Sequence, residues 1–447
     1  MKILYRAFRH VYRAGRWLRR RLTPAGALAA SVLALAAAFG ADTRQSNAYQ
    51  VFALGLALLG LSVALSMARR PRFAARRVLP TYATVGEPLE YTLVVINEGR
   101  RELQGATLRD HLEDAFPDYE AFRDARAPGD EKRNWFDRRV GYQRWERLLR
   151  HARGAEVREA VLERLAAGGE ARVRMGLTPR RRGVLRFAAT ALALPDPLGL
   201  SYALTYRAAP GELIVLPPRY PTRARALQGA RRYQPGGVAQ ASKVGDSEEF
   251  VALREYRPGD PLRRMHWRSW ARTGRPVVKE CQDEYFVRSA LALDTFAGRQ
   301  AGTEFEAAVS VAASFACAPR GADSMLDLVF VGDRAYTFTA GRGQLPLEGM
   351  LRILAAVQPA GDGDFARLSR AVLARAGLLS GLVCVLLDWD PPRQDLVRRL
   401  RALRVPLEVL VLADAKRPAP DPGPMADLPE HFHLLDPRRL GEQLAAL

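Results

Sequence analysis

The sequence has little cysteine. Its 447 residues include only three cysteines, which lie far apart and form no CxxC pair. An odd number of isolated cysteines excludes a disulfide framework and provides no zinc site. We therefore expect buried thiols in a reducing compartment, at Cys281, Cys317 and Cys384.

Several catalytic motifs are missing as well. The chain has no GxxxxGKS or GxxxxGKT loop for a nucleotide and no HExxH pair for zinc. His431 and His433 lie on one face of an extended segment, but the sequence offers no third or fourth ligand beside them. We therefore expect no cofactor, and we expect that the chain is not an enzyme.

Acidic residues are absent from two basic stretches. Residues 1–21 and 69–77 contain no aspartate or glutamate, and their lysine and arginines account for 13 of the formal charges in a net charge of +20. Those residues are Lys2, Arg6, Arg9, Arg13, Arg16, Arg19, Arg20, Arg21, Arg69, Arg70, Arg72, Arg76 and Arg77. Because this excess flanks apolar segments, it indicates a membrane rather than a nucleic acid partner.

Two uncharged apolar runs, residues 24–41 and 48–68, lie between these basic stretches. Each is close to the roughly 20 residues that a helix needs to cross a bilayer, and the link between them is too short for a cleaved signal peptide. The sequence thus predicts a transmembrane helical hairpin within residues 1–77. The positive-inside rule places both ends in the cytoplasm, which predicts a multi-pass protein of the bacterial inner membrane with cytoplasmic soluble domains.

The soluble part begins with short β-like runs. YTLVVIN (91–97), ARVRMGL (171–177) and GVLRF (183–187) predict a small β-sandwich over residues 78–217. A charged and aromatic stretch, residues 118–153, predicts a helical insertion with an aromatic packing face. Its apolar and aromatic residues are Trp135, Phe136, Tyr142, Trp145, Leu148 and Leu149.

A connector and a distinctive segment occupy residues 218–285, and an alternating α/β pattern occupies residues 286–447. Candidate strands at 290–294, 326–331, 382–388 and 407–414 alternate with candidate helices at 304–318, 345–357 and 394–403. Continuous Val/Leu strands separated by helices predict an open, largely parallel sheet covered on both faces. The expected architecture is therefore multi-domain.

The most distinctive stretch is residues 254–274. Pro258-Gly259 predicts a turn, with Asp260 as helix N-cap, Pro261 at the first helical position and Gly274 at the end of about three turns. On that helix Arg264, Arg268 and Arg272 form a cationic stripe, and Leu262, His266 and Trp270 form a neighbouring face. The arginine stripe either binds phosphate or carboxylate groups or is a solvated face. His266 is either a general base or a structural, hydrogen-bonded histidine.

The run REYRPGDPLRRMHWRSWARTGRPVVKE (254–280), with LALD (291–294), RRRGVLRF (180–187) and DPLGL (196–200), resembles the bacterial domain of unknown function 58 family. The resemblance implies paired membrane helices, an immunoglobulin-like sandwich and a C-terminal domain similar to von Willebrand factor type A. It also implies action beside AAA+ ATPases of the MoxR class. Its signature residues in this chain are Arg254, Tyr256, Gly259, Asp260, Arg263, Arg264, His266, Trp267, Arg268 and Arg272.

The type A resemblance raises the question of a metal site. Asp294 matches the first position of Asp-x-Ser-x-Ser, but Phe296 and Gly298 stand in the serine positions, and Asp388 is the other candidate carboxylate. Without the two hydroxyls we expect no Mg²⁺ site.

The leading hypothesis is a membrane-tethered cytoplasmic scaffold or adaptor that binds proteins, among them a AAA+ ATPase. The alternatives are a metal-dependent hydrolase that uses Asp294, Asp388 and His266, and an anionic-surface binder that uses the Arg264 stripe. The oligomeric state stays open.

Overall fold

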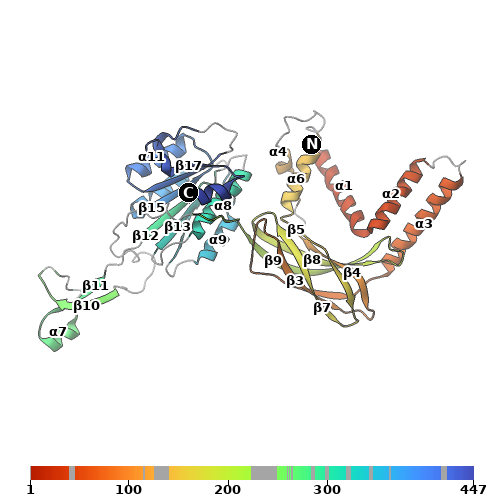
Figure 1. The fold of residues 1–447 in the computed structure, drawn as a ribbon, viewed down its shortest axis with the longest axis horizontal. Helices are drawn as coiled ribbons and strands as arrows, with labels where there is room; N and C mark the ends of the chain where they lie inside the picture. The colour runs from red at the N-terminus through yellow and green to blue at the C-terminus, as the bar shows by residue number, and fades with distance from the viewer. Residues whose placement is uncertain are drawn as a thin grey trace. The chain divides into compact units, whose positions relative to one another are not determined.

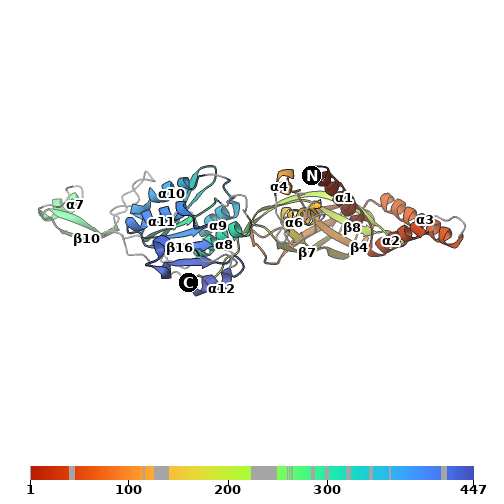
Figure 2. The same ribbon diagram turned by 90° about the horizontal axis from the view of Figure 1, so that it is seen from above.

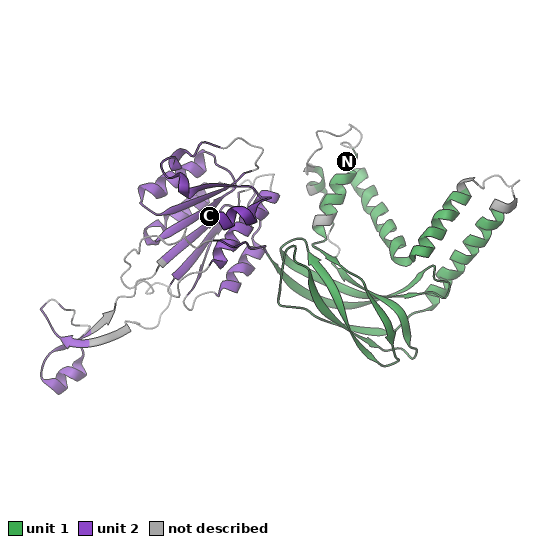
Figure 3. Ribbon diagram, viewed as in Figure 1, with its two compact units in different colours: residues 1–216 green, residues 217–447 purple. Residues whose placement is uncertain are grey.

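The protein is a mixed α/β chain in two compact units, residues 1–216 and 217–447 (Figure 3). The structure is a computed structural model. It describes residues 2–39, 46–113, 116–124, 140–222, 249–258, 260, 262, 265–282, 287–296, 302–318, 324–341, 346–361, 364–413 and 420–447.

Unit 1 begins with three helices, α1 (Lys2–Arg21), α2 (Pro24–Phe39) and α3 (Ser46–Ala68) (Figure 1). Within α3, Tyr49–Ala68 is long and apolar enough to cross a membrane, and it is the one such span in the described part of the chain. The apolar stretch of α2, Pro24–Ala37, is shorter than a full span. In the apolar run expected at 24–41, the described residues 24–39 form a helix of 16 residues.

The basic N-terminus forms a helix, and its aromatic side chains pack against another helix of unit 1. Tyr5 and Phe8 of α1 pack against Trp145, with ring centroids 5.4 and 6.3 Å away. Trp145 belongs to α6 (Tyr142–Ala152), which with α4 (Tyr119–Asp124) forms the expected helical insertion. Trp145 is 1% exposed, so this aromatic side chain packs, as predicted; Trp135 and Phe136 lie outside the described residues.

Two sheets follow, and they enclose one hydrophobic core. The four-stranded sheet has the order β1-β3-β7-β5, with bounds Phe73–Val78, Leu89–Asn97, Glu170–Pro179 and Ala155–Val157. The five-stranded sheet has the order β2-β9-β8-β4-β6, with bounds Tyr82–Thr84, Tyr202–Leu216, Gly183–Pro195, Leu103–Leu112 and Ala160–Leu165. Alternate residues of β3, among them Leu93 and Val95, are fully buried between the sheets.

Arg77, the last residue of the basic stretch 69–77, is part of the sheet domain. It lies on β1 and donates to both carboxylate oxygens of Asp110 at 2.7 Å, and both side chains are buried. Tyr91 and Thr190 donate to the same carboxylate, at 2.7 and 2.6 Å. Burial raises the pKa of the Tyr91 phenol. Arg77 is therefore a core residue of the two-sheet unit.

The loop between β8 and β9 holds the base of the helical hairpin. The hydroxyl of Ser201 lies 2.7 Å from that of Ser62 and 2.6 Å from that of Ser66, and all three side chains are buried. Thr23 donates its hydroxyl to the carbonyl oxygen of Gly199 at 2.6 Å. This loop contains the DPLGL motif, and Asp196 shapes it by accepting from the backbone amide of Ser201 at 2.7 Å.

Unit 2 is built on a six-stranded sheet with the order β14-β13-β12-β15-β16-β17, parallel except at the β13–β14 edge. In that order the strands are Ala335–Ala340, Ser324–Val331, Val287–Leu293, Gly381–Leu386, Leu407–Leu412 and Phe432–Leu435. The helices that accompany this sheet are α8 (Thr303–Cys317), α9 (Leu347–Ala356), α10 (Ala366–Leu373), α11 (Pro391–Ala402) and α12 (Leu440–Ala446). Short 3-10 turns are η5 (Ala376–Leu378), η6 (Gly423–Met425) and η7 (Pro429–His431). The topology agrees with the expected open, largely parallel sheet.

Both faces of this sheet are covered by helices (Figure 2). Ala290 and Ala292 on β12 pack with residues of α10 and α11, whereas α8 contacts β12 from the other face. Cys384 on β15 is fully buried, and burial raises the pKa of its thiol to about 12. Cys384 is thus one of the expected buried thiols, whereas Cys317 is partly exposed and the side chain of Cys281 lies outside the description.

Candidate functional site

The signature segment forms an antiparallel two-stranded ribbon with a short helix inserted. Strands β10 (Glu249–Glu255) and β11 (Val277–Gln282) pair, and α7 (Trp267–Thr273) lies between them in the chain. Two of its contacts hold the helix start to the ribbon: Met265 bridges to Val278, and the amide of His266 donates to the carbonyl oxygen of Val277 at 2.8 Å.

The prediction that Asp260 is a helix N-cap is wrong. The helix begins at Trp267, with His266 in the cap position, so it has two turns rather than three. The carboxylate of Asp260 is instead held by Arg254, whose two terminal nitrogens donate to its two oxygens at 2.7 Å each. The amide of Arg257 donates to the same carboxylate at 2.8 Å. Arg254 and this amide lower the pKa of Asp260 to about 2.

The expected end of the helix is correct. Gly274 adopts a left-handed conformation with φ of 69°, and its amide donates to the carbonyl oxygen of Trp270. Because α7 begins at Trp267, it carries two arginines of the predicted stripe, Arg268 and Arg272, which are four residues apart and share a helical face. Gly259, Arg263 and Arg264 lie outside the described residues.

A pair of tryptophans marks the outer surface of α7. Trp267 is 62% exposed, and its ring stacks on that of Trp270 with 5.3 Å between centroids. Arg268 and Arg272 on the same helix are also exposed. His266 accepts or donates a hydrogen bond with the Ser269 hydroxyl at 2.7 Å, and Tyr256 donates its amide to the carbonyl oxygen of Pro276. The segment therefore combines an internally bonded histidine with an aromatic and cationic surface.

The strand end at Asp294 holds an ion pair. Asp294 is fully buried, and Arg393 of α11 donates to its Oδ2 from Nε at 2.7 Å. The amides of Phe296 and Leu387 also donate to Asp294, at 2.9 and 3.0 Å. The other nitrogens of Arg393 reach Asp390 at 2.6 Å and the carbonyl oxygen of Phe296 at 3.2 Å.

This geometry leaves Asp294 poorly suited to a metal. Burial raises the pKa of its carboxyl, and the Arg393 guanidinium and the two amides oppose that rise. Asp388 is exposed and accepts from the amide of Trp389, whereas the hydrogen bonds of His266 stay within the signature segment. No cluster of three metal-ligating side chains occurs among the described residues. Asp294 and Asp388 thus lie at the ends of the neighbouring strands β12 and β15, whereas the hydrogen bonds of His266 connect it to neither.

His431 and His433 share one partner, Glu408. The carboxylate oxygens of Glu408 lie 3.0 Å from His431 Nδ1 and 2.6 Å from His433 Nε2. Each carboxylate oxygen thus accepts or shares one imidazole proton. The two imidazoles therefore serve to satisfy a buried acid at the sheet edge.

Sequence reasoning missed Arg393 and Asp390. The run Asp390-Pro391-Pro392 is a helix-start pattern, and in the structure Asp390 caps α11 by accepting from the amide of Arg393. The sequence analysis began this helix at residue 394. It therefore left Arg393 outside the helix, and no linear pattern pairs it with Asp294, 99 residues away.

Comparison with known proteins identifies the central segment. Residues 252–427 match the model of the family described as "Protein of unknown function DUF58". The uncharacterized protein Rv1480 of Mycobacterium tuberculosis is 27% identical over 206 residues, which cover 44% of this chain and 65% of that protein. The uncharacterized protein YeaD of Bacillus subtilis is 26% identical over 197 residues, which cover 43% of this chain and 48% of YeaD.

Solved structures give weaker likenesses. The CARDB domain of a Pyrococcus furiosus protein, solved in complex with di-metal ions, matches at 11% identity and a TM-score of 0.17, covering 33% of this chain and 89% of that domain. Proximal thread matrix protein 1 from the mussel byssus matches at 10% identity and a TM-score of 0.29, covering 36% of this chain and 44% of that protein.

Proposed function

We propose that this chain is a membrane-tethered scaffold or adaptor, without catalytic activity of its own, that binds a protein partner through its signature segment. The observation that carries the proposal is the Trp267–Trp270 pair. Trp267 stacks on Trp270 but stays 62% exposed. Packing among the described residues therefore does not explain why a tryptophan occupies this position. Tryptophan and arginine are the side chains most enriched at energetically important positions of protein interfaces.

Other contacts of the signature segment hold the Trp267–Trp270 pair in a fixed position. The Arg254–Asp260 ion pair closes the loop before α7, and Met265, which is 7% exposed, anchors the helix start on β11. A pre-organised surface loses less conformational entropy on binding than a loose one. The partner class to test first is a AAA+ ATPase of the MoxR class, and this choice follows from the family resemblance alone.

The membrane tether is the second part of the proposal. Large apolar side chains of α2 and α3 are exposed, among them Val32, Leu35, Leu54 and Leu61 at 50–63%. Contiguous apolar surface of this kind belongs in contact with lipid or protein. We propose that both helices enter the bilayer, although α2 spans only about 24 Å at 1.5 Å per residue and requires local thinning.

We also propose the orientation of the helical hairpin in the membrane and the fold classes of the two soluble domains. Basic residues flank the hairpin on both outer sides, so the soluble domains face the cytoplasm at the bacterial inner membrane. The two-sheet domain is proposed to be immunoglobulin-like, and the C-terminal sheet domain to be similar to von Willebrand factor type A.

Co-purification tests the adaptor function. The full chain is expressed with a MoxR-class ATPase from the same bacterium, solubilised in detergent and captured by an affinity tag. We expect the ATPase to be retained by the unchanged chain and lost with Trp267→Ala, because truncation of a central aromatic residue removes most of its contact area. The pair Arg268→Ala and Arg272→Ala should weaken retention more at low salt than at high salt, because high salt already screens these exposed charges in the unchanged chain.

Leu347→Ala provides the matched control, because Leu347 is 42% exposed on α9 of the same unit. It should retain the ATPase at the level of the unchanged chain. Retention that is equal in the Trp267 and Leu347 variants would refute the assignment of the interface to α7. Failure of the unchanged chain to retain any MoxR-class ATPase of its bacterium would refute the choice of partner.

A further inference from the structure

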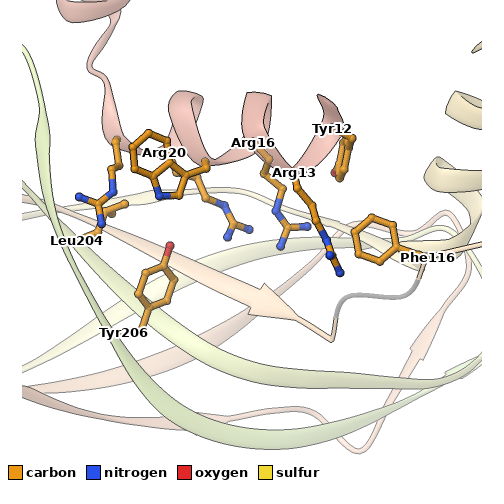
Figure 4. Close-up of a pocket in the computed structure, with 9 residues that line it drawn as sticks. Tyr12, Arg13, Arg16, Arg20, Phe116, Leu204 and Tyr206 are labelled. Atoms are coloured by element: carbon orange, nitrogen blue, oxygen red, sulfur yellow. The ribbon is translucent and has the colours of Figure 1, made fainter. Parts of the chain in front are cut away.

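A groove lined by arginines lies between α1, the end of α3 and strand β9, all within unit 1. Figure 4 shows its part under α1. The groove consists of two adjoining pockets of about 300 and 530 Å³ that share Arg21, Leu204 and Tyr206. The lining arginines are Arg13, Arg16, Arg20, Arg21, Arg69, Arg70, Arg72 and Arg207. The groove therefore concentrates positive charge from two basic stretches that are far apart in the sequence.

No aspartate or glutamate lines either pocket among the described residues. Arg16 and Arg20 have partners of their own, and Nη2 of Arg20 lies 3.1 Å from Nδ1 of His111. The charge for a ligand therefore comes from the other lining arginines, among them Arg13, Arg21 and Arg69. The guanidinium of Arg13 lies over the ring of Phe116 at 5.1 Å, and that of Arg21 lies over the ring of Trp17 at 5.0 Å. An aromatic face positions a guanidinium without neutralising its charge. Figure 4 shows Arg13 and Arg16 pointing from α1 into the same space below the helix. The ligand that suits this groove is an anion with several oxygens.

The position of the groove indicates where that anion comes from. Ser66 and Met67, in the last turn of the candidate span Tyr49–Ala68, line the second pocket. Twenty helical residues cross the hydrocarbon core, so the end of the span lies at the depth of the lipid headgroups.

The exposed face of α1 also indicates a position at the depth of the lipid headgroups. Ile3, Val11, Trp17 and Leu18 are 83, 69, 58 and 48% exposed, although the opposite face of the helix packs on the protein. A helix that exposes apolar and tryptophan side chains among arginines is typical of the membrane interface. The groove thus lies between an interfacial helix and the end of a span.

We propose that this groove binds the phosphate headgroup of an anionic phospholipid in the leaflet where α3 ends. Arginine pairs donate in parallel to phosphate oxygens, and the exposed Met67 lies where an acyl chain would continue along α3. The inference rests on the membrane tether proposed above, and it is independent of the protein partner.

Native mass spectrometry of the full chain in a non-ionic detergent tests the site, with phosphatidylglycerol and phosphatidylcholine added at equal concentration. We expect retention of phosphatidylglycerol to exceed that of phosphatidylcholine by about fivefold or more, since each arginine near an anionic headgroup contributes about that factor. The triple variant Arg13→Gln, Arg21→Gln and Arg69→Gln should lose this preference. Inorganic phosphate at the same concentration should not displace the lipid.

Two further variants keep the test decisive. Tyr206→Glu places a carboxylate in the part that both pockets share and leaves every arginine in place, so it should also abolish the preference. The control is Arg172→Gln, Arg174→Gln and Arg186→Gln, which removes the same charge from exposed positions on β7 and β8 and should keep the preference.

Three outcomes overturn the inference: equal retention of the two lipids by the unchanged chain, equal loss in the control triple, or displacement by inorganic phosphate or a short DNA duplex. Membrane extraction with carbonate separates this inference from the tether. A chain that carbonate strips from membranes would refute the tether. A chain that stays in the membrane without lipid preference would refute only the groove.

Discussion

Arg393 donates its Nε hydrogen to Oδ2 of Asp294 across 2.7 Å, at the end of strand β12. Open α/β sheets hold their ligands at the carboxyl ends of such strands. In this chain the guanidinium of Arg393 occupies that position. The Arg393 side chain is 7% exposed, and the Asp294 side chain is fully buried. The relationship makes this strand end a structural element of unit 2.

Removal of one partner of this pair should destabilise unit 2. Arg393→Met leaves the Asp294 carboxylate buried without its counter-charge, and we expect a loss of about 3–5 kcal/mol in the free energy of unfolding. Denaturant titration of the full chain in detergent, with hydrogen exchange of β12 and β15 as the local probe, measures it. The double variant Asp294→Asn, Arg393→Met should recover most of the loss.

The control for this prediction is Arg398→Met on the same helix. Arg398 is 62% exposed, so its replacement should change the free energy of unfolding by no more than about 0.5 kcal/mol. A double variant as unstable as Arg393→Met alone would contradict the ion-pair account.

Divalent metal should bind weakly or not at all. Arg393 already provides the positive charge beside Asp294, and Mg²⁺ requires several oxygen ligands in octahedral geometry. Isothermal titration of the full chain with MgCl₂ and MnCl₂ should show no micromolar binding. Micromolar binding that disappears in Asp294→Ala would revive the hydrolase hypothesis.

Asp260 should act on the loop before α7 rather than on the helix. In Asp260→Asn the amide of Arg257 loses its charged acceptor, so we expect faster hydrogen exchange at the amides of Tyr256 and Arg257 and little change across α7. Because the pKa of Asp260 is lowered to about 2, its carboxylate stabilises the loop above the ordinary aspartate range near 3.9 and loses this effect only as pH falls toward 2. Protection factors at pH 7 and pH 5 should therefore agree. Faster exchange confined to α7 would restore the capping role.

The hairpin orientation gives a topological prediction. Alkaline phosphatase fused after Gln45, between the two apolar helices, should be active because the enzyme folds in the periplasm. Fusions after Arg70 and after Leu447 should be inactive, since both positions are predicted to be cytoplasmic. Activity of either of these two fusions would contradict the hairpin model.

Elements that depend on local pattern could be predicted from the sequence. The continuous Val/Leu run of β16 and the alternating pattern of β3 each indicate a strand from nearby residues alone. Gly274 likewise ends α7 at a position that requires a left-handed backbone conformation. The error at Asp260 has a physical reason. A carboxylate before a proline suits an N-cap, but the nearby guanidinium of Arg254 offers it two charged hydrogen bonds, which are stronger than one amide.

Long-range pairings could not be predicted in this way. Arg77 has the same appearance in the sequence as the other arginines that flank the apolar helices, yet its partner Asp110 is 33 residues away on another strand. The groove under α1 likewise combines Arg13 with Arg69 and Tyr206 through the fold alone. A single sequence contains no signal for such contacts, because their partners are brought together only by the packing of sheets and helices.

The three hydroxyls that meet at Ser201 have a mechanical consequence. Ser62 and Ser66 belong to α3, and Thr23 at the start of α2 holds the same loop through Gly199. The loop in turn joins β8 to β9, the longest pair in unit 1. A tilt of the apolar helices therefore acts as a torque on that ribbon. Under the proposed membrane tether, the thickness of the bilayer would become a load on the two-sheet domain.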